Sequence, residues 1–447
     1  MNSIKKYFRD LFITTRFYGV LLVCICLFFV SFYLPAINSI AIIVFFAFLI
    51  FCLADYCFLF FTKKFPSAKR NTAGRLSNGD ENKIELIIKN EFSFTVNINV
   101  IDELPEQFQD RKWKRHLQLT GKQLKKIFYH LKPLKRGDYN FGDIHLFITS
   151  QLGFVCRRFT SEAEEIIPVY PSFMQLYKYE LLSNAIIQHE GGSTRMRKIG
   201  QSMEFEQIKE YVTGDDIRTL NWKASARKGN LMVNNFMDER SQQVYCIIDK
   251  GRLMKMPFAG LTLLDYAINS CLILSNICLK KQDRVGAITF SNTIGSVLAA
   301  DKKPIQKDHI LQLLYNQTTN FLESDFEMLY TQVRNRIKHR SLLILFTNFE
   351  SLSGLNRQID YLRSLATHHL LLVVFFENTE LEKLTTSHAT NVEEVYIKTI
   401  GEKFAYEKRL IAKELMKYGI LSLLTSPQKL TVNAINKYLE LKTRQAI

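Results

Sequence analysis

The sequence lacks the short motifs that mark several common catalytic chemistries. It contains no G-x-x-x-x-G-K-[ST] loop for nucleotide phosphates, no H-E-x-x-H pair for zinc and no G-x-S-x-G turn for a nucleophilic serine. Each of these motifs holds its functional groups at a fixed spacing, so its absence excludes that way of building the site. The sequence therefore does not support a P-loop nucleotide hydrolase, a zinc protease of that type or a serine hydrolase with that turn.

Cysteine is present, but the arrangements that bind metals or form redox pairs are missing. The sequence has no C-x-x-C pair and no zinc-ligand spacing. Four of the eight cysteines lie in long apolar runs near the start of the chain, and the other four are scattered. This usage is typical of free thiols in a reducing cytosol.

Acidic residues are too few to balance the basic ones. The chain has 59 Lys and Arg against 43 Asp and Glu, a formal net charge of +16. Such a chain favours an anionic neighbour, either nucleic acid or a membrane surface. We expect no nucleic-acid binding, because no aromatic or helical element for reading bases is evident. The partners expected instead are inner-membrane lipids and a protein.

Charge is almost absent from two consecutive stretches. Residues 17–34 contain no charged side chain, and residues 40–61 contain only Asp55. Each is close to the ~20 residues that a membrane-spanning helix needs. Two runs in tandem, without a small-residue cleavage site, disfavour a signal peptide. Residues 1–70 are therefore predicted to form a transmembrane hairpin, with Asp55 hydrated near the cytoplasmic interface; a functional intramembrane acid is the alternative.

Basic residues flank the predicted hairpin on both sides but are absent from its turn. The positive-inside rule then places both termini and the soluble domains in the cytoplasm, with the hairpin in the inner membrane. The flanking residues are Lys5, Lys6, Arg9, Arg16, Lys63, Lys64, Lys69 and Arg70.

The rest of the chain divides by its hydrophobic periodicity. Residues 71–172 alternate apolar and polar positions without a long helical run, which predicts a small β-sandwich. Residues 244–447 alternate strand-like and helix-like segments, which predicts a doubly wound, mostly parallel sheet with a hairpin-linked antiparallel edge strand. Residues 173–243 lie between them; their glycine-rich part, residues 190–202, is predicted to be a solvated connection, with an anion-contacting loop as the alternative.

The segment from 204 to 231 is unusually dense in charged and aromatic residues. Asp215 or Asp216 is predicted to cap a short helix beginning near Ile217. Trp222 and Ala226 are four residues apart, so they share a helix face, and Trp222 is predicted to pack against the sheet. The segment is either a structural clasp between domains or a partner-binding surface built on that clasp.

The spacing in this segment resembles the core motif of the domain of unknown function 58 family. The matching residues are Glu204, Phe205, Ile208, Tyr211, Gly214, Asp215, Asp216, Arg218, Leu220, Trp222, Lys223, Ala226, Arg227 and Leu231. The resemblance implies a membrane hairpin, a von Willebrand factor A-like C-terminal domain and a MoxR-type AAA+ ATPase as partner. The expected function is a membrane-anchored adaptor or scaffold in the assembly of envelope complexes. The alternative is an uncharacterised hydrolase or transferase that uses the acidic residues.

The same resemblance implies a metal site that this sequence does not complete. Many von Willebrand factor A domains bind Mg²⁺ through Asp-x-Ser-x-Ser, a later Thr and a later Asp. Here Asp249 is kept, while Gly251 and Leu253 replace the serines, Thr319 or its neighbour stands for the Thr, and Asn348 replaces the Asp. We expect no cofactor, with a weak Mg²⁺ site as the alternative. Because Asp215 and Asp216 are adjacent, they suit paired acid–base catalysis poorly, and no catalytic residue is predicted.

Overall fold

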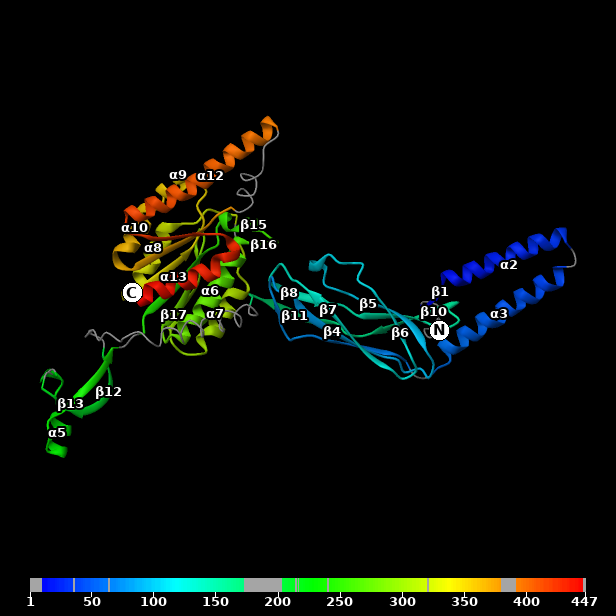
Figure 1. The fold of residues 1–447 in the computed structure, drawn as a ribbon, viewed down its shortest axis with the longest axis horizontal. Helices are drawn as coiled ribbons and strands as arrows, with labels where there is room; N and C mark the ends of the chain where they lie inside the picture. Colours follow the sequence, from blue (N-terminus) through cyan, green and yellow to red (C-terminus); the bar gives the residue numbers. More distant parts are fainter. Residues whose placement is uncertain are drawn as a thin grey trace. The chain divides into compact units, whose positions relative to one another are not determined.

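The computed structural model describes residues 10–34, 37–62, 65–172, 203–213, 215, 217–238, 241–319, 321–378 and 391–444. The predicted loop at 190–202, Gly214 and Asp216 lie outside these residues. The chain divides into two compact units, Met1–Ser172 and Phe173–Ile447, and each is described by itself (Figure 1).

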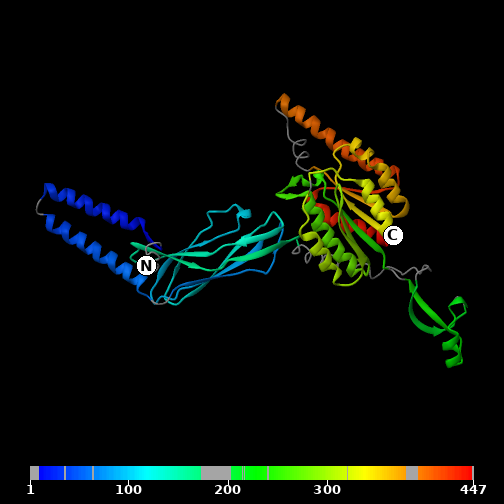
Figure 2. The ribbon, with the colours of Figure 1, turned by 180° about the vertical axis from the view of Figure 1, so that it is seen from behind.

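The first unit begins with a pair of long apolar helices. Helices α2 (Thr15–Tyr33) and α3 (Asn38–Phe60) run side by side (Figures 1 and 2). Both are long and apolar enough to cross a membrane, and only 11% and 17% of their most apolar windows are buried within the protein. Two helices this apolar and this exposed suggest a membrane anchor. The two predicted apolar helices are confirmed as helices.

Three small sheets make up the rest of the first unit. One has the order β1-β10-β9-β5-β6, the second β2-β4-β7 and the third β3-β11-β8. Neighbouring strands are antiparallel except β3 and β11. The bounds are β1 Leu11–Ile13, β2 Ser67–Asn71, β3 Leu76–Ser77, β4 Asn82–Lys89, β5 Val96–Asp102, β6 Arg115–Leu119, β7 Leu124–Leu131, β8 Gly137–Phe141, β9 Ile144–Thr149, β10 Val155–Ser161 and β11 Glu165–Tyr170, with a 3-10 turn η2 at Glu106–Phe108.

Alternation along these strands produces a single core. On β4, Ile84, Leu86 and Ile88 are fully buried while the residues between them are more exposed, which is the period of two expected for a strand. They join the same cluster as Leu59 and Phe60, the last residues of α3. The β-rich region and the end of the apolar hairpin therefore share one hydrophobic core.

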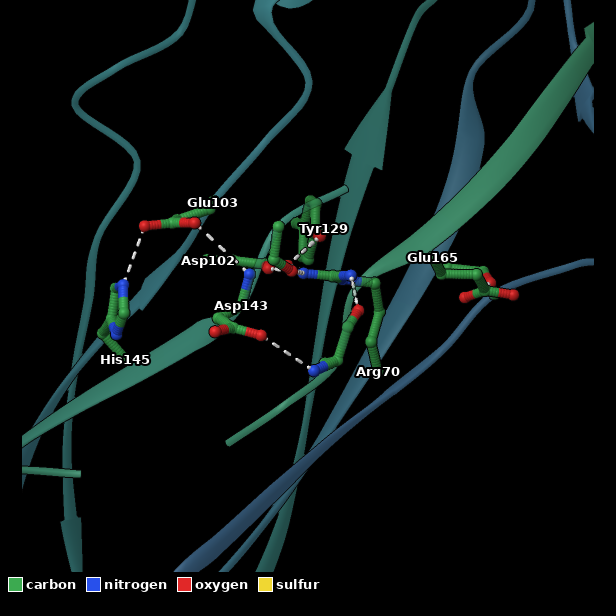
Figure 3. A network of polar contacts seen from close by, with 10 residues as sticks. Arg70, Asp102, Glu103, Tyr129, Asp143, His145 and Glu165 are labelled. Atoms are coloured by element: carbon green, nitrogen blue, oxygen red, sulfur yellow. Dashed lines mark hydrogen bonds and ion pairs between the residues drawn. The ribbon is translucent and has the colours of Figure 1, made fainter. Parts of the chain in front are cut away.

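A buried ion pair lies inside this unit (Figure 3). The guanidinium of Arg70 on β2 bonds both carboxylate oxygens of Asp102 at the end of β5, and its Nη1 and Nη2 donate to the carbonyls of Ala163 and Gly142 at 2.8 and 2.9 Å. The hydroxyl of Tyr129 on β7 also donates to Asp102. Arg70 was grouped with the basic flank of the hairpin, but it is 6% exposed and serves this network. An arginine that follows an apolar run gives no sign that it will pair, inside the core, with a carboxylate 32 residues further along the chain.

Asp55 is not hydrated, and this part of the prediction is wrong. Its side chain is fully buried near the end of α3. One carboxylate oxygen accepts from Ser150 Oγ, and the other accepts the backbone N–H groups of Phe154 and Val155, both at 2.9 Å. Asp55 therefore fastens the second apolar helix to the loop that leads into β10.

The second unit contains a six-stranded mixed sheet with helices on both faces (Figure 1). Its order is β18-β17-β14-β19-β20-β21, and only β18 is antiparallel to its neighbour. The strands are β14 Gln243–Asp249, β17 Arg284–Phe290, β18 Ile294–Asp301, β19 Leu342–Phe346, β20 Leu370–Phe376 and β21 Leu421–Thr425. The predicted antiparallel edge strand is confirmed.

The helices divide between the two faces of this sheet. Helices α8 (Phe326–Arg336), α9 (Leu352–Asn356), α10 (Ile359–His368) and α12 (Val392–Lys417) contribute to one core cluster with the strands. Helices α6 (Leu263–Lys280), α7 (Gln306–Tyr315) and α13 (Leu430–Thr443) pack together with the strands as a second group. Helix α6 is apolar enough to suggest a membrane span, but 89% of it is buried, so it is a core helix. Short elements complete the unit: η4 Arg252–Lys255, β15 Pro257–Phe258, β16 Leu261–Thr262 and η5 Pro427–Lys429.

Candidate functional site

The segment singled out by its composition folds as a small element of its own. Strands β12 (Met203–Glu210) and β13 (Met232–Asp238) pair antiparallel, and the connection between them carries a 3-10 turn η3 (Ile217–Thr219) and helix α5 (Trp222–Lys228). We call residues 203–238 the signature element. The backbone of Glu204 and Phe205 lies in β12, and their side chains are outside the described atoms.

Two polar side chains join helix α5 to strand β13 within the signature element. Asn221 caps α5 by accepting the N–H of Ala224 at 3.0 Å, and its amide donates to Asn234 on β13 at 2.8 Å. The hydroxyl of Ser225 accepts the N–H of Met232 at 2.8 Å. These bonds satisfy the backbone of a helix too short to be stable alone. The element therefore presents α5 in a fixed orientation on its own hairpin.

Asp215 holds the turn after β12 rather than capping a helix. Its carboxylate accepts from Lys209 Nζ at 2.8 Å and from the N–H of Val212 at 3.1 Å. These bonds lower the pKa of Asp215, so it is ionised at neutral pH. The predicted cap is Asp215 or Asp216: the carboxylate oxygens of Asp215 bond Lys209 and the N–H of Val212 instead, and Asp216 lies outside the described residues. A carboxylate engaged in this way is poorly suited to be a general acid.

Trp222 does not pack against the sheet as predicted. It is 70% exposed, and four other large apolar side chains of the element are exposed with it. Ala226 and the basic residues Arg218, Lys223 and Arg227 are exposed too, while Tyr211 is half-buried. The exposed apolar group consists of Ile208, Val212, Ile217, Trp222 and Leu231. The spacing of four residues correctly places Trp222 and Ala226 on the same face of the helix, but it does not predict whether that face is buried or exposed.

The second candidate site lies at the carboxyl end of β14. From β14, the chain first adds β17 and β18 on one side and then β19, β20 and β21 on the other. The carboxyl ends of β14 and β19 therefore meet where the strand order reverses, which is where ligand crevices form in sheets of this kind. Asp249, the last residue of β14, is 3% exposed at this point.

Both carboxylate oxygens of Asp249 have protein partners. One accepts from Ser324 Oγ and from the N–H of Gly251 at 2.8 Å, and the other accepts from Thr347 Oγ1 at 2.7 Å. Burial raises the pKa of Asp249, and these bonds oppose that rise. The hydroxyl that reaches Asp249 from the loop before α8 belongs to Ser324, and no hydrogen bond among the described residues joins Thr319 to it.

The residues at the two serine positions have other roles. A Cβ at Gly251 would lie 2.1 Å from Ser324 Oγ, so a serine there would displace the Asp249–Ser324 contact. Leu253 lines a shallow pocket of about 380 Å³ with Arg252, Met256 and Glu350.

Lys408 is not among the predicted site residues, yet its ammonium lies beside Asn348. Its ammonium donates to Asn348 Oδ1 at 2.6 Å and to the carbonyl of Phe349. It comes from α12, 60 residues further along the chain. Burial lowers its pKa to about 8. A positive charge therefore sits at Asn348, where the resemblance leads one to expect the later aspartate. The packing of α12 on the sheet brings Lys408 to Asn348, and a single sequence does not predict that packing.

Comparisons with known proteins match the C-terminal part of the chain. The family described as "Protein of unknown function DUF58" matches residues 207–403, from β12 to within α12. The uncharacterized protein YeaD of Bacillus subtilis (strain 168) is 26% identical over 215 residues, which are 46% of this chain and 53% of YeaD. The chain thus spans about half the length of this curated relative.

Two solved structures show weak likeness to part of the chain. The conserved hypothetical protein BatB from Bacteroides thetaiotaomicron has a TM-score of 0.32 at 12% identity, over 46% of this chain and 100% of its own. The CARDB domain of the PF1109 protein from Pyrococcus furiosus has a TM-score of 0.17 at 12% identity, over 24% of this chain and 87% of its own.

Proposed function

We propose that this protein is a membrane-anchored adaptor or scaffold that presents its signature element to a protein partner. Its parts would be a transmembrane hairpin, a β-sandwich and a von Willebrand factor A-like domain, with both termini in the cytoplasm. The partner proposed from the family resemblance is a MoxR-type AAA+ ATPase acting in the assembly of envelope complexes. The observation that carries the proposal is the exposure of Trp222 among apolar and basic side chains on a fixed element.

The character of this surface favours a protein partner. Large aromatic residues beside arginine are the groups that contribute most to protein interfaces. Apolar side chains exposed together are unusual on a soluble surface without a partner. The exposed Lys223, Arg227 and Lys228 beside them favour a partner with acidic side chains at the rim of the contact.

Replacing Trp222 by alanine is expected to weaken binding to the ATPase by about 30-fold or more, the loss of an interface hot spot of ~2 kcal/mol. The measurement is the dissociation constant between the full chain in phospholipid nanodiscs and a purified MoxR-type ATPase from the same organism. The fold should be unaffected, because Trp222 is 70% exposed.

The matched control is Tyr396→Ala, which removes another exposed aromatic side chain, 68% exposed on α12. It should leave the dissociation constant unchanged. If the wild-type chain and the Trp222 variant bound with equal affinity, the signature element would not be part of the interface. If the wild-type chain did not bind at all, the ATPase would not be the partner.

We also propose that the crevice beside Asp249 does not hold Mg²⁺ as a cofactor. Mg²⁺ favours carboxylate and water oxygens in octahedral geometry. The carboxylate of Asp249 is already bonded by Ser324 and Thr347, and the ammonium of Lys408 bonds Asn348. This donor set does not fit the ion.

Isothermal titration of the full chain with Mg²⁺ or Mn²⁺ is expected to show no micromolar binding. Asp249→Ala is the control that would assign any heat to this crevice. Micromolar binding by the wild-type chain that disappears in Asp249→Ala would contradict the proposal.

A further inference from the structure

A second cavity lies at the amino ends of β19 and β20, whereas the Asp249 crevice lies at the carboxyl ends of the strands. Its volume is about 170 Å³, and its walls come from α8, α10 and the residues that lead into the two strands. Helices α8 and α10 pack against each other here. Their last turns and the start of β20 thus enclose a space that no part of the proposed function uses.

The charged side chains around this cavity are all basic or imidazole. No Asp or Glu lines it, and within the described part of the chain no ion pair engages Arg334, Lys338 or Arg340. Arg334 contacts only neutral oxygen, the hydroxyl of Tyr330 at 3.4 Å. The lining groups that carry or can carry positive charge are Arg334, Lys338, Arg340, His368 and His369.

Helix dipoles explain part of this charge but not all of it. Cations near the carboxyl ends of α8 and α10 interact favourably with the exposed carbonyls there. That accounts for Arg334 and Lys338, and Lys338 does donate to the carbonyl of Arg334 at 3.4 Å. It does not account for Arg340, which follows α8 by several residues and belongs to the connection into β19.

His369 supplies the second, independent observation. It is 6% exposed and lines the cavity, and its Nδ1 is buried without a hydrogen-bond partner. Its backbone N–H is used, donating to the carbonyl of Leu365 at 3.0 Å. A buried ring nitrogen without a partner destabilises the fold unless something else satisfies it. In the tautomer that carries a hydrogen on Nδ1, this nitrogen needs an acceptor, and the basic lining favours an anion as that acceptor.

We propose that this cavity binds a phosphate group. Arginine and lysine converge on it from α8 and from the strand connection, and guanidinium groups match phosphate oxygens in geometry. The imidazole of His369 would form the inner wall and donate to the anion. Burial and the neighbouring His368 lower the pKa of His369 in the free protein, and a bound anion would oppose this effect by favouring the imidazolium form. The phosphate could be that of a soluble phosphorylated compound or of a lipid headgroup.

The test titrates inorganic pyrophosphate into the full chain held in nanodiscs of phosphatidylcholine. Arg340→Gln is expected to weaken binding at least about tenfold, the loss of one charge-assisted contact. Arg409→Gln, the same change at an exposed position on α12, should leave binding unchanged. Both positions are exposed, so neither substitution should unfold the domain.

A second variant tests the inner wall. His369→Asn keeps a polar side chain but removes the imidazole, and it too should weaken pyrophosphate binding. Nanodiscs containing phosphatidic acid then separate the two sources: competition with pyrophosphate assigns the site to a headgroup, and its absence assigns the site to a soluble phosphate. The proposal is overturned if the wild-type chain binds no pyrophosphate at millimolar concentration, or if Arg340→Gln and Arg409→Gln bind it equally.

Discussion

Replacing Asp102 by alanine is expected to lower the free energy of unfolding of the first unit by about 3–5 kcal/mol, because it leaves a buried arginine without its counter-charge. The side chain of Arg70 is 1% exposed and that of Asp102 is 0% exposed, so water does not replace the lost partner. The hydroxyl of Tyr129 would lose its acceptor as well.

Tryptophan fluorescence can follow this unfolding directly. Trp113 packs against Tyr129, with ring centroids 4.6 Å apart, and the chain's other tryptophan is Trp222. In a Trp222→Phe background, Trp113 alone therefore reports the first unit during a urea titration of the full chain in detergent. The shift in the urea midpoint gives the change in stability.

Two controls separate burial from charge. Glu91→Gln removes the half-buried partner of the exposed Lys89 and should cost less than about 1 kcal/mol. The triple replacement Arg70→Met, Asp102→Leu and Tyr129→Phe removes the charges together, and it should be more stable than Asp102→Ala alone. A midpoint for Asp102→Ala equal to that of Glu91→Gln would show that the network contributes little.

The elements that one sequence predicted well are those whose signal is repeated along the chain. Helices α2 and α3 follow from two runs of spanning length, the first uncharged and the second with Asp55 as its one charge, and only the low burial of their side chains had to come from the structure. The mixed sheet follows from strands alternating with helices, and the antiparallel edge follows from the three residues that separate β17 from β18. Such patterns are averages over many residues, so single exceptions do not obscure them.

The candidate sites depend instead on single side chains brought together by the fold. Ser324 and Thr347 reach Asp249 from 75 and 98 residues away. Nothing local distinguishes Ser324 from Thr319, since both are hydroxyl residues in the same connection. Lys408 is one of many lysines in its helix, and only the packing of α12 on the sheet selects it.

Asp55 shows the same limit at the membrane. An acid inside an apolar run is expensive in lipid, so sequence reasoning must choose between hydration and function. The structure provides a third possibility, in which protein donors surround the carboxylate. Ser150 and the N–H groups of Phe154 and Val155 come from a loop about 100 residues further on, which the run itself does not reveal.

Replacing Asp55 by alanine is expected to speed hydrogen exchange at the amides of Phe154 and Val155 by about 100-fold. Each amide would lose a hydrogen bond to a charged acceptor, worth roughly 1.5–3 kcal/mol in the free energy of local opening. The measurement is hydrogen–deuterium exchange, followed by mass spectrometry of peptides covering residues 150–158, on the full chain in nanodiscs. Ser150→Ala should have a smaller effect, because it leaves both amides bonded to Asp55.

Phe51→Leu controls for general loosening of the hairpin, since Phe51 lies on the exposed side of α3 at 53% exposure. It should leave exchange at these amides unchanged. If Asp55 were hydrated at the interface, its replacement would change exchange no more than Phe51→Leu does. A large, local increase would instead show that the carboxylate holds the backbone at the point where strand β10 begins, because the donors it binds are the N–H groups of Phe154 and Val155.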